Sequence, residues 1–297
     1  MKVWKAELML LLMTMIWGAT FLFTKMGIDS VTPVFYLILR FSLALALLLI
    51  FFGKYFLKID KSLIWKGILL GGIFGLGFIL QTKGLEYTKI QKSAFITGLT
   101  VALTPFTFKL ISKKKIALFS WIGVVVATIG LYIFTNPTID TFNIGDVYTV
   151  LSTFCWAFFI TFLDKFTKDD HSFAYTIRLV FLQVVGTLLV CTIFFFGLDS
   201  ESYNSNFYLD NELIISVVFN GLLASFLLMI IHTNYQRYTS PVKAALIFSL
   251  EPVFASIVAL IFTTEVLTGL EYIGASVLFF GVLISELGSY IFKIKSQ

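Results

Sequence analysis

Ten long apolar runs constrain the fold of this 297-residue chain more than any other feature of its sequence. A helix needs about 20 apolar residues to cross the hydrocarbon core of a bilayer. Strands of a membrane barrel alternate between apolar and polar residues over about 10 positions, whereas these runs are continuously apolar. A helix also satisfies its backbone hydrogen bonds within its own segment. We therefore predict helices at 6–26, 33–53, 64–83, 91–110, 117–135, 146–164, 174–197, 213–236, 243–262 and 270–292.

The composition excludes a water-soluble globular protein. Hydrophobic residues make up 58% of the chain and charged residues only 13%, which is far from the usage of a soluble domain. Ten spans of about 20 residues occupy roughly 200 positions and leave only short connections. The chain is therefore predicted to be an all-α integral membrane protein with ten transmembrane helices, embedded in the lipid bilayer.

The distribution of lysines predicts the orientation of the chain. Most of the basic connections fall on the same side as the amino terminus, and such connections usually face the cytoplasm. We expect a multi-pass protein with both termini in the cytoplasm. The opposite side carries acidic residues, with an exception at Lys83, Lys89 and Lys92. The basic residues on the first side are Lys54, Lys58, Lys61, Lys66, Lys113 to Lys115, Lys165, Lys168, Lys293 and Lys295, and the acids on the other are Asp199, Glu201, Asp210 and Glu212.

The net charge of +5 does not point to nucleic acid. The basic residues are spread over several connections, as the orientation rule requires, and they form no single patch. Cys155 and Cys191 lie inside predicted spans without the spacing of a metal site or a disulfide framework. We expect no nucleic-acid partner, no metal and no cofactor.

An internal duplication relates the two halves of the chain. A shift of 151 positions superposes the pairs Tyr87-Thr88 and Tyr238-Thr239, Ala94 and Ala245, Ile122-Gly123 and Ile273-Gly274, and Gly130 and Gly281. Nearer the start of each half, Trp17 and Arg40 correspond to Trp156 and Arg178. The repeat unit is thus five helices, over residues 1–137 and 138–297.

Because five is an odd number, the second unit must enter the membrane from the other side, and the two repeats are inverted. Inverted repeats enclose a midplane site in many secondary transporters, which expose that site alternately to each side. The alternative is a duplication retained only for packing.

Several segments resemble the drug/metabolite transporter superfamily, in its ten-helix EamA branch. They are IWGATFLFTK, LRFSLALALL, GLEYTKIQKSAFI, CWAFF, YTSPVKAALIFSLEPVFASIVAL and YIGASVLFFGVLI, which together extend over nearly the whole chain. The resemblance implies a carrier of the inner (plasma) membrane, commonly an exporter of amino acids or other small metabolites, driven by a gradient and not by ATP. One departure is that Thr100-Val101 stands where the second half has Glu251-Pro252 and that Pro105 follows instead, so we expect the two halves to be kinked differently.

Glu251 is the first candidate for a functional residue. It lies about eight residues beyond Lys243 in a predicted span, at a depth where a carboxylate must be paired, protonated or in contact with water. Pro252 disfavours helical geometry at Glu251 and removes a hydrogen bond from the preceding turn. Such a kink can bind a cation, an amine or a proton. The alternative is that the carboxylate joins its helix to a neighbouring donor.

Polar residues in other predicted spans are candidates for the lining of a cavity. Ser93, Thr97, Thr100 and Thr104 share one helix face, and Thr100 is the repeat partner of Glu251. Trp17 and Trp156 lie midway along their spans, away from the interfaces where membrane tryptophans usually gather. For each of these the alternative is a structural hydrogen bond to a neighbouring helix. The candidate substrate-binding residues are Trp17, Gln81, Thr97, Thr100, Trp156, His232 and Glu251, with Glu251 and Pro252 as the coupling and kink residues.

Arg40 and Arg178 lie one to two turns inside their spans. Long basic side chains at this depth can extend to the membrane interface. We therefore expect both residues to be interfacial anchors or to form a salt bridge with an acid in a loop.

No enzyme signature is present. The sequence contains no GxxxxGK[ST] phosphate loop, no HExxH pair and no GxSxG elbow,. The sequence favours a proton- or ion-coupled exporter of a small-molecule substrate. An uncoupled facilitator that uses the same cavity and a non-transporting sensor or assembly subunit are the alternatives, and a homodimer is a partner that the sequence leaves open.

Overall fold

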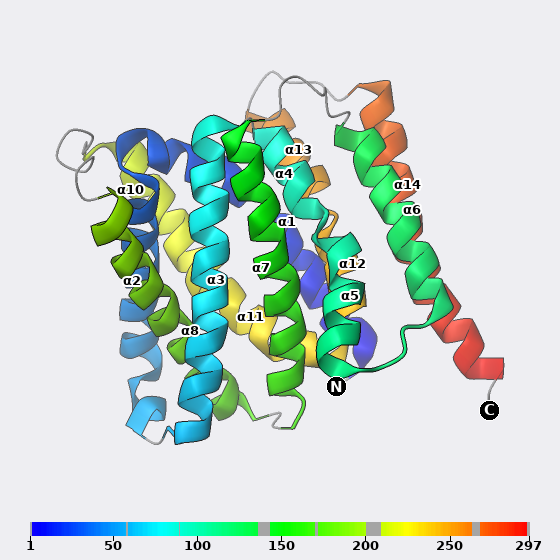
Figure 1. The fold of residues 1–297 in the computed structure, drawn as a ribbon, viewed down its shortest axis with the longest axis horizontal. Helices are drawn as coiled ribbons and strands as arrows, with labels where there is room; N and C mark the ends of the chain where they lie inside the picture. Colours follow the sequence, from blue (N-terminus) through cyan, green and yellow to red (C-terminus); the bar gives the residue numbers. More distant parts are fainter. Residues whose placement is uncertain are drawn as a thin grey trace.

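The computed structural model describes residues 2–57, 59–88, 90–135, 143–169, 172–199, 209–262 and 268–295, and the described part contains helices and no strands. Figure 1 shows an upright bundle with the amino and carboxyl termini at the same end. Lys58, Lys89 and Glu201, which entered the orientation prediction, lie outside the described residues. The same holds for the side chains of Asp199, Lys293 and Lys295.

The first half of the chain forms six α-helices and one short 3₁₀ helix. They are α1 (Val3–Ser30), α2 (Pro33–Phe52), η1 (Gly53–Leu57), α3 (Lys61–Tyr87), α4 (Ile90–Gly98), α5 (Thr100–Ser112) and α6 (Leu118–Thr135).

The second half repeats this pattern with more irregular turns. Its elements are α7 (Ile144–Thr167), α8 (Phe173–Phe194), η2 (Phe195–Asp199), α10 (Asn211–Val218), the π-helical η3 (Phe219–Leu227), α11 (Leu228–Tyr235), η4 (Gln236–Tyr238), α12 (Pro241–Phe248), α13 (Glu251–Phe262) and α14 (Gly269–Lys295).

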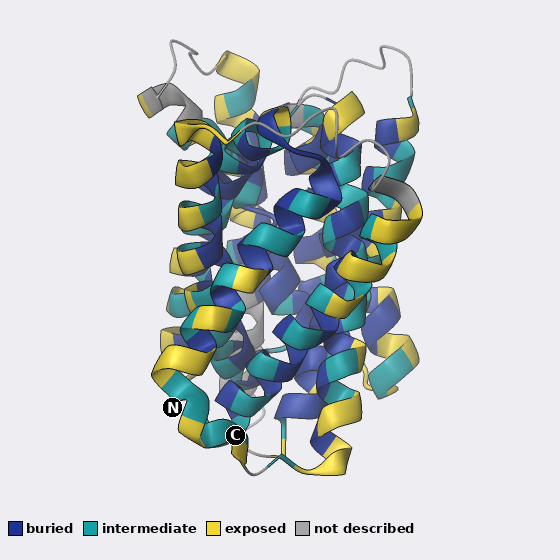
Figure 2. Ribbon diagram, turned by 90° about the vertical axis from the view of Figure 1, so that its left-hand side faces the viewer, coloured by how far each residue is buried: buried dark blue, intermediate teal, exposed yellow. Residues whose placement is uncertain are grey.

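Each of the ten predicted spans coincides with a helical segment. Eight segments of the described chain are long and apolar enough to cross a membrane, and the apolar parts of α6 and α14, at Leu118–Phe134 and Gly269–Ser285, are shorter. The prediction of a helical, multi-pass membrane protein is confirmed. Figure 2 shows buried residues toward the middle of the bundle and exposed residues along its outer faces, as expected for helices with lipid-facing sides.

Helix α3 packs against α7 and α8, and α6 packs against α14 at one edge of the bundle (Figure 1). Glycines from both halves make the second interface tight. A Cβ on Gly123 would lie 2.6 Å from the carbonyl oxygen of Gly281, and a Cβ on Gly130 would overlap the backbone of Leu278. Small residues allow two helix backbones to approach in this way.

Helix α3 presents a second glycine contact, at Gly71. A Cβ on Gly71 would overlap the main-chain carbonyl oxygen of Gln183 in α8, whereas a Cβ on Gly72 would lie 3.9 Å from the nearest atom, in Val190. We expect Gly71→Ala to destabilise the protein by about 1–3 kcal/mol, because the added carbon overpacks a backbone contact. Thermal unfolding in detergent measures the change. Gly72→Ala is the matched control and should be neutral or slightly stabilising, since alanine favours helix over glycine; equal melting temperatures for the two variants would contradict the contact.

The predicted spans 91–110 and 243–262 are each broken into two helices. Helix α4 ends at Gly98 and α5 begins at Thr100, whereas α12 ends at Phe248 and α13 begins at Glu251. Thr100 and Glu251 are the positions that the 151-residue shift superposes. The expectation that the two halves are kinked differently is therefore wrong.

The two breaks have different local causes. Pro252 is the second residue of α13, a position where its missing N–H costs no intrahelical hydrogen bond. The break in the first half has no proline, and Pro105 lies inside α5 without ending it. At that break Gly98 packs so closely on Leu131 of α6 that a Cβ would lie 2.7 Å from a Leu131 methyl carbon. The break in the first half therefore coincides with close packing on α6 and not with a proline in the local sequence.

Candidate functional site

Both helix breaks border one cavity in the interior of the bundle. Its empty volume, counted together with its opening, is about 650 Å³, which lies within the roughly 300–1,000 Å³ of small-molecule sites. The lining residues are Trp17, Thr20, Arg40, Phe74, Phe78, Gln81, Thr97, Gly98, Thr100, Trp156, Phe159, Ile160, His232, Ala245, Phe248, Ser249 and Glu251.

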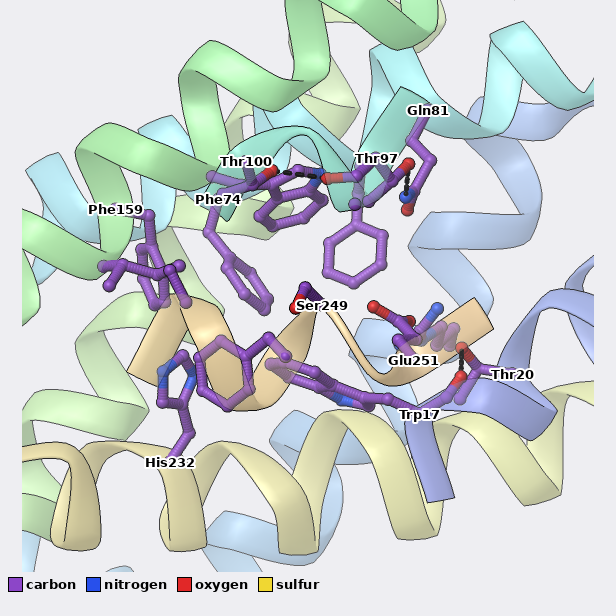
Figure 3. Close-up of a pocket in the computed structure, with 17 residues that line it drawn as sticks. Trp17, Thr20, Phe74, Gln81, Thr97, Thr100, Phe159, His232, Ser249 and Glu251 are labelled. Atoms are coloured by element: carbon purple, nitrogen blue, oxygen red, sulfur yellow. Dashed lines mark hydrogen bonds between the residues drawn. The ribbon is translucent and has the colours of Figure 1, made fainter. Parts of the chain in front are cut away.

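The structure brings together all seven residues that the sequence proposes for substrate binding. They come from seven different helices: Trp17 from α1, Gln81 from α3, Thr97 from α4, Thr100 from α5, Trp156 from α7, His232 from α11 and Glu251 from α13. Figure 3 shows Gln81, Thr97 and Thr100 on one wall of the cavity, with Glu251, Trp17 and His232 on the opposite wall. Pro252 follows Glu251 in α13 and is not among the lining residues.

The Glu251 carboxylate lies at the first turn of α13, and Glu251 is partly exposed to the cavity. Within the described residues it has no hydrogen-bond or ion-pair partner. The positive end of a helix dipole favours a negative charge at this place, but an apolar cavity still makes a bare carboxylate expensive. Glu251 is therefore placed to accept a proton or a positively charged group of a ligand.

Arg40 also lines the cavity, and the expectation that it extends to the interface is wrong. The residue is 2% exposed, its Nε donates to Ser225 Oγ at 2.6 Å, and its guanidinium carbon lies 4.5 Å from the centre of the Phe78 ring. No carboxylate in the described part of the chain pairs with it. The hydroxyl in η3 and the aromatic face hold the cation inward. A buried guanidinium of this kind is ready to bind an anionic group.

Arg178, the repeat partner of Arg40, has a different environment. Its Nε donates to the main-chain carbonyl of Tyr55 in η1 at 2.8 Å, and it is not among the residues that line the cavity. This contact at the end of the bundle agrees with an anchoring role. The two arginines occupy equivalent positions in the repeat, and nothing in the sequence indicates that only Arg40 lines the cavity.

The hydroxyl groups at the first break form a short chain. Gln81 Nε2 donates to Thr97 Oγ1 at 3.0 Å, and Thr100 Oγ1 donates to the carbonyl of Thr97 at 2.6 Å. Thr97 and Thr100 line the cavity, whereas Ser93 and Thr104, which share their predicted face, are buried but do not line it. The two hydroxyls nearest the break therefore face the cavity, and the two farther from it do not.

Trp156 and His232 present polar atoms beside aromatic walls. The indole Nε1 of Trp156 is buried and has no acceptor among the described residues, and its ring lies 4.9 Å from that of Phe78. His232 Nε2 lies 2.5 Å from Gln236 Oε1. Because the Gln236 amide nitrogen donates to the carbonyl of Ile160 at 2.6 Å, its oxygen faces the imidazole, so Nε2 donates and Nδ1 is left as an acceptor.

Sequence reasoning did not identify the aromatic walls themselves. Phe74, Phe78, Phe159 and Phe248 line the cavity, but nothing in the sequence distinguishes them from the other members of a set of 34 phenylalanines. The His232 ring stands edge-on to those of Trp17 and Phe248, at 5.4 Å and 5.1 Å. Within the described residues, no group of three His, Cys, Asp or Glu side chains is arranged to hold a metal ion.

Comparison with known protein families gives a match over both halves of the chain. The model of the EamA-like transporter family matches residues 4–136 and again residues 143–287. An uncharacterized transporter of Archaeoglobus fulgidus is 29% identical over 285 residues, which cover 95% of this chain and 86% of the relative.

Two bacterial relatives match over nearly the same length. The uncharacterized transporter YyaM of Bacillus subtilis is 27% identical, and the match covers 95% of this chain and 94% of the relative. The uncharacterized inner membrane transporter YedA of Escherichia coli K12 is 23% identical, covering 94% and 90%. A solved structure titled only "Crystal structure of protein" superposes with a TM-score of 0.75 at 13% identity, over 95% of this chain and 98% of that chain, and so shares the fold.

Proposed function

Because the chain belongs to the EamA-like transporter family, we propose that it is a secondary transporter of the inner (plasma) membrane that exports small metabolites such as amino acids by alternating access. The matching family and the named relatives carry transporter names, which supports a transporter over an enzyme. A membrane transporter of this kind acts on small-molecule substrates within the lipid bilayer.

One observation carries the substrate class: a guanidinium and a carboxylate without charged partners in the described chain line the same cavity, at Arg40 and Glu251. Arg40 offers N–H donors to a substrate carboxylate. Glu251 offers an acceptor to a substrate ammonium group. The unpaired indole N–H of Trp156 supplies a further donor, and the phenylalanines provide apolar walls for a side chain.

Alternating access is supported by the correspondence of the halves. The helix breaks that border the cavity lie at equivalent positions, Thr100 and Glu251, and the family model matches once in each half. Broken helices that meet at the membrane midplane are typical of transporters built from two inverted repeats. We propose two inverted five-helix repeats, over residues 1–137 and 138–297, that rock about the cavity.

The orientation is part of the same proposal. Five spans in each repeat, ten in all, place both termini on one side of the membrane, and the lysines of that side indicate the cytoplasm. In an export cycle the substrate then enters from the cytoplasm, while the cavity is open toward that side. This is the end of the bundle that carries both termini (Figure 1).

Glu251 supports coupling to protons or to another cation. Its carboxylate is partly exposed to the cavity and has no partner in the described chain, so it can bind substrate or a proton in turn. An uncoupled facilitator, in which Glu251 stays in one protonation state, is the second candidate within the same cavity.

Transport by purified protein in liposomes tests the proposal. We expect a panel of labelled amino acids and small metabolites to include one class that accumulates when a pH gradient is imposed. Empty liposomes and liposomes with a heat-denatured sample are the controls. If folded protein moves none of the panel in either direction, the transporter proposal for these substrates fails, and a sensor or assembly role gains support.

A further inference from the structure

Two clusters of charged and hydroxyl side chains lie outside the cavity, at opposite ends of the bundle. The first, named the Asp146 cluster, consists of Thr88, Lys92 and Asp146. Lys92 Nζ lies 2.6 Å from Asp146 Oδ2, and Thr88 Oγ1 donates to Asp146 Oδ1 at 2.9 Å. The Asp146 side chain is fully buried. The cluster joins the start of α4 to the start of α7.

The second, named the Glu7 cluster, consists of Glu7, Thr239 and Lys243. Thr239 Oγ1 donates to Glu7 Oε1 at 2.9 Å, and Lys243 Nζ lies 3.7 Å from the same oxygen. The side chains of Glu7 and Lys243 are 15% and 16% exposed. The cluster joins the beginning of α1 to the beginning of α12, at the end of the molecule where the amino terminus lies (Figure 1).

The two clusters are formed by residues at equivalent positions of the two halves. The shift of 151 positions carries Thr88 and Lys92 onto Thr239 and Lys243. The shift that relates Trp17 to Trp156 carries Glu7 onto Asp146. In each case an acid on the first helix of one half binds a threonine and a lysine of the other half, so both clusters bridge the halves.

The two clusters differ in how tightly they are formed. The Asp146 ion pair is short, and its carboxylate has no contact with solvent although its Lys92 side chain is 24% exposed. The Glu7 ion pair is 1.1 Å longer (3.7 against 2.6 Å), and its carboxylate is 15% exposed. Breaking a buried ion pair leaves an uncompensated charge unless water enters. The Asp146 end is therefore the more firmly closed end in this structure.

We propose that the Asp146 cluster and the Glu7 cluster are alternating ionic gates, one of which opens to water while the other is closed. This proposal rests on the proposed alternating access. Each gate is built from a carboxylate, a threonine hydroxyl and a lysine, so each can close in the same way, and a ligand that binds one state of the cavity more tightly shifts the balance between the two gates. In this structure the Asp146 gate is closed and the Glu7 gate is loosened.

The helices that carry the lysines explain how the gates are linked to the cavity. Lys92 is in α4 and Lys243 is in α12, and these are the half-helices that end at the two breaks. A movement of α4 or α12 that separates a lysine from its acid also moves the cavity residues near the break, Thr97 or Ser249. The break provides the hinge between the gate half and the other half of each span.

A cysteine reporter in the cavity tests the gates. Ser249 lines the cavity just beyond the end of α12, and its hydroxyl donates to the carbonyl of Leu246 at 2.7 Å, so Ser249→Cys is a small change. The native thiols, Cys155 and Cys191, are removed by Cys→Ala substitution. The rate of modification by a membrane-impermeant maleimide is then measured in intact cells and in inside-out vesicles, which present opposite faces.

We expect Asp146→Asn to raise the modification rate about tenfold in one preparation, and Glu7→Gln to raise it in the other. A tenfold change corresponds to roughly 1.4 kcal/mol in the balance between the two states. Lys92→Met opens the same gate as Asp146→Asn but leaves intact the capping box that Asp146 forms with Asn143 at the start of α7. If Lys92→Met and Asp146→Asn raise the modification rate alike, the increase comes from loss of the ion pair and not from loss of the helix cap.

Asp164→Asn is the matched control. Asp164 is equally buried and pairs with Lys168 at 2.5 Å, but the pair lies within one stretch of chain, four residues apart, and bridges no halves. It should leave the sidedness of labelling unchanged. The gates are refuted if folded Asp146→Asn and Glu7→Gln proteins label at unchanged rates, or if both raise the rate in the same preparation. Labelling requires no substrate, so this result is independent of whether the liposome experiment finds a transported compound.

Discussion

In Glu251→Gln we expect accumulation driven by a pH gradient to be lost while downhill flux is retained. A gradient of one pH unit stores about 1.4 kcal/mol per proton, enough for about a tenfold concentration ratio at one proton per substrate. The amide cannot take up and release a proton, so the ratio should fall to one. The two side chains have nearly the same size, and the cavity around residue 251 should keep its shape.

Liposome uptake with and without the imposed gradient measures this ratio directly. Glu271→Gln is a suitable control, because its carboxylate binds the backbone N–H of Thr268 at the start of α14 and does not line the cavity. That variant should accumulate substrate as the unchanged protein does. Unaltered accumulation in Glu251→Gln would eliminate coupling through Glu251 and favour the uncoupled facilitator.

For Arg40→Met we expect the KM for substrates that bear a carboxylate to rise on the order of 10- to 100-fold. This is the range expected when a hydrogen bond to a charged group is removed from a buried site. The KM of Arg40→Lys should lie between those of the unchanged protein and of Arg40→Met, since an ammonium group keeps the charge but lacks the planar pair of donors. Initial rates of uptake over a range of substrate concentrations measure the change.

The comparison that identifies a binding role uses a substrate and its amide analogue. Loss of Arg40 should weaken transport of the carboxylate far more than transport of the amide. Arg178→Met is the matched control, because Arg178 binds the Tyr55 carbonyl away from the cavity, and it should leave the KM unchanged for both compounds. An equal loss for both compounds in Arg40→Met would instead assign Arg40 to packing against Phe78 and Ser225.

The sequence by itself determined the class of structure and the positions of the helices. Continuous apolar runs of helix length can be satisfied in a bilayer in very few ways, so each of the ten runs coincides with a helical segment. The sequence also singled out Glu251 and Thr100 through the repeat, and both lie at helix breaks beside the cavity. Their part in binding or coupling is a prediction that the flux experiments address.

Only the tertiary structure decided which polar groups share the cavity. Arg40 and Arg178 are equivalent in the repeat, yet Ser225 and the Phe78 ring hold one inward, while the Tyr55 carbonyl holds the other at the end of the bundle. The break at Leu99 likewise forms without a proline.

The same limit applies to the two ion-pair clusters, in which each acid lies from 54 to 236 positions away from its partners in the chain. The pattern of apolar and polar residues records how deeply each residue is buried along its own helix. It does not record which neighbouring helix faces it. The partners of a buried charge are set by contacts between distant segments, and these exist only once the halves have packed together.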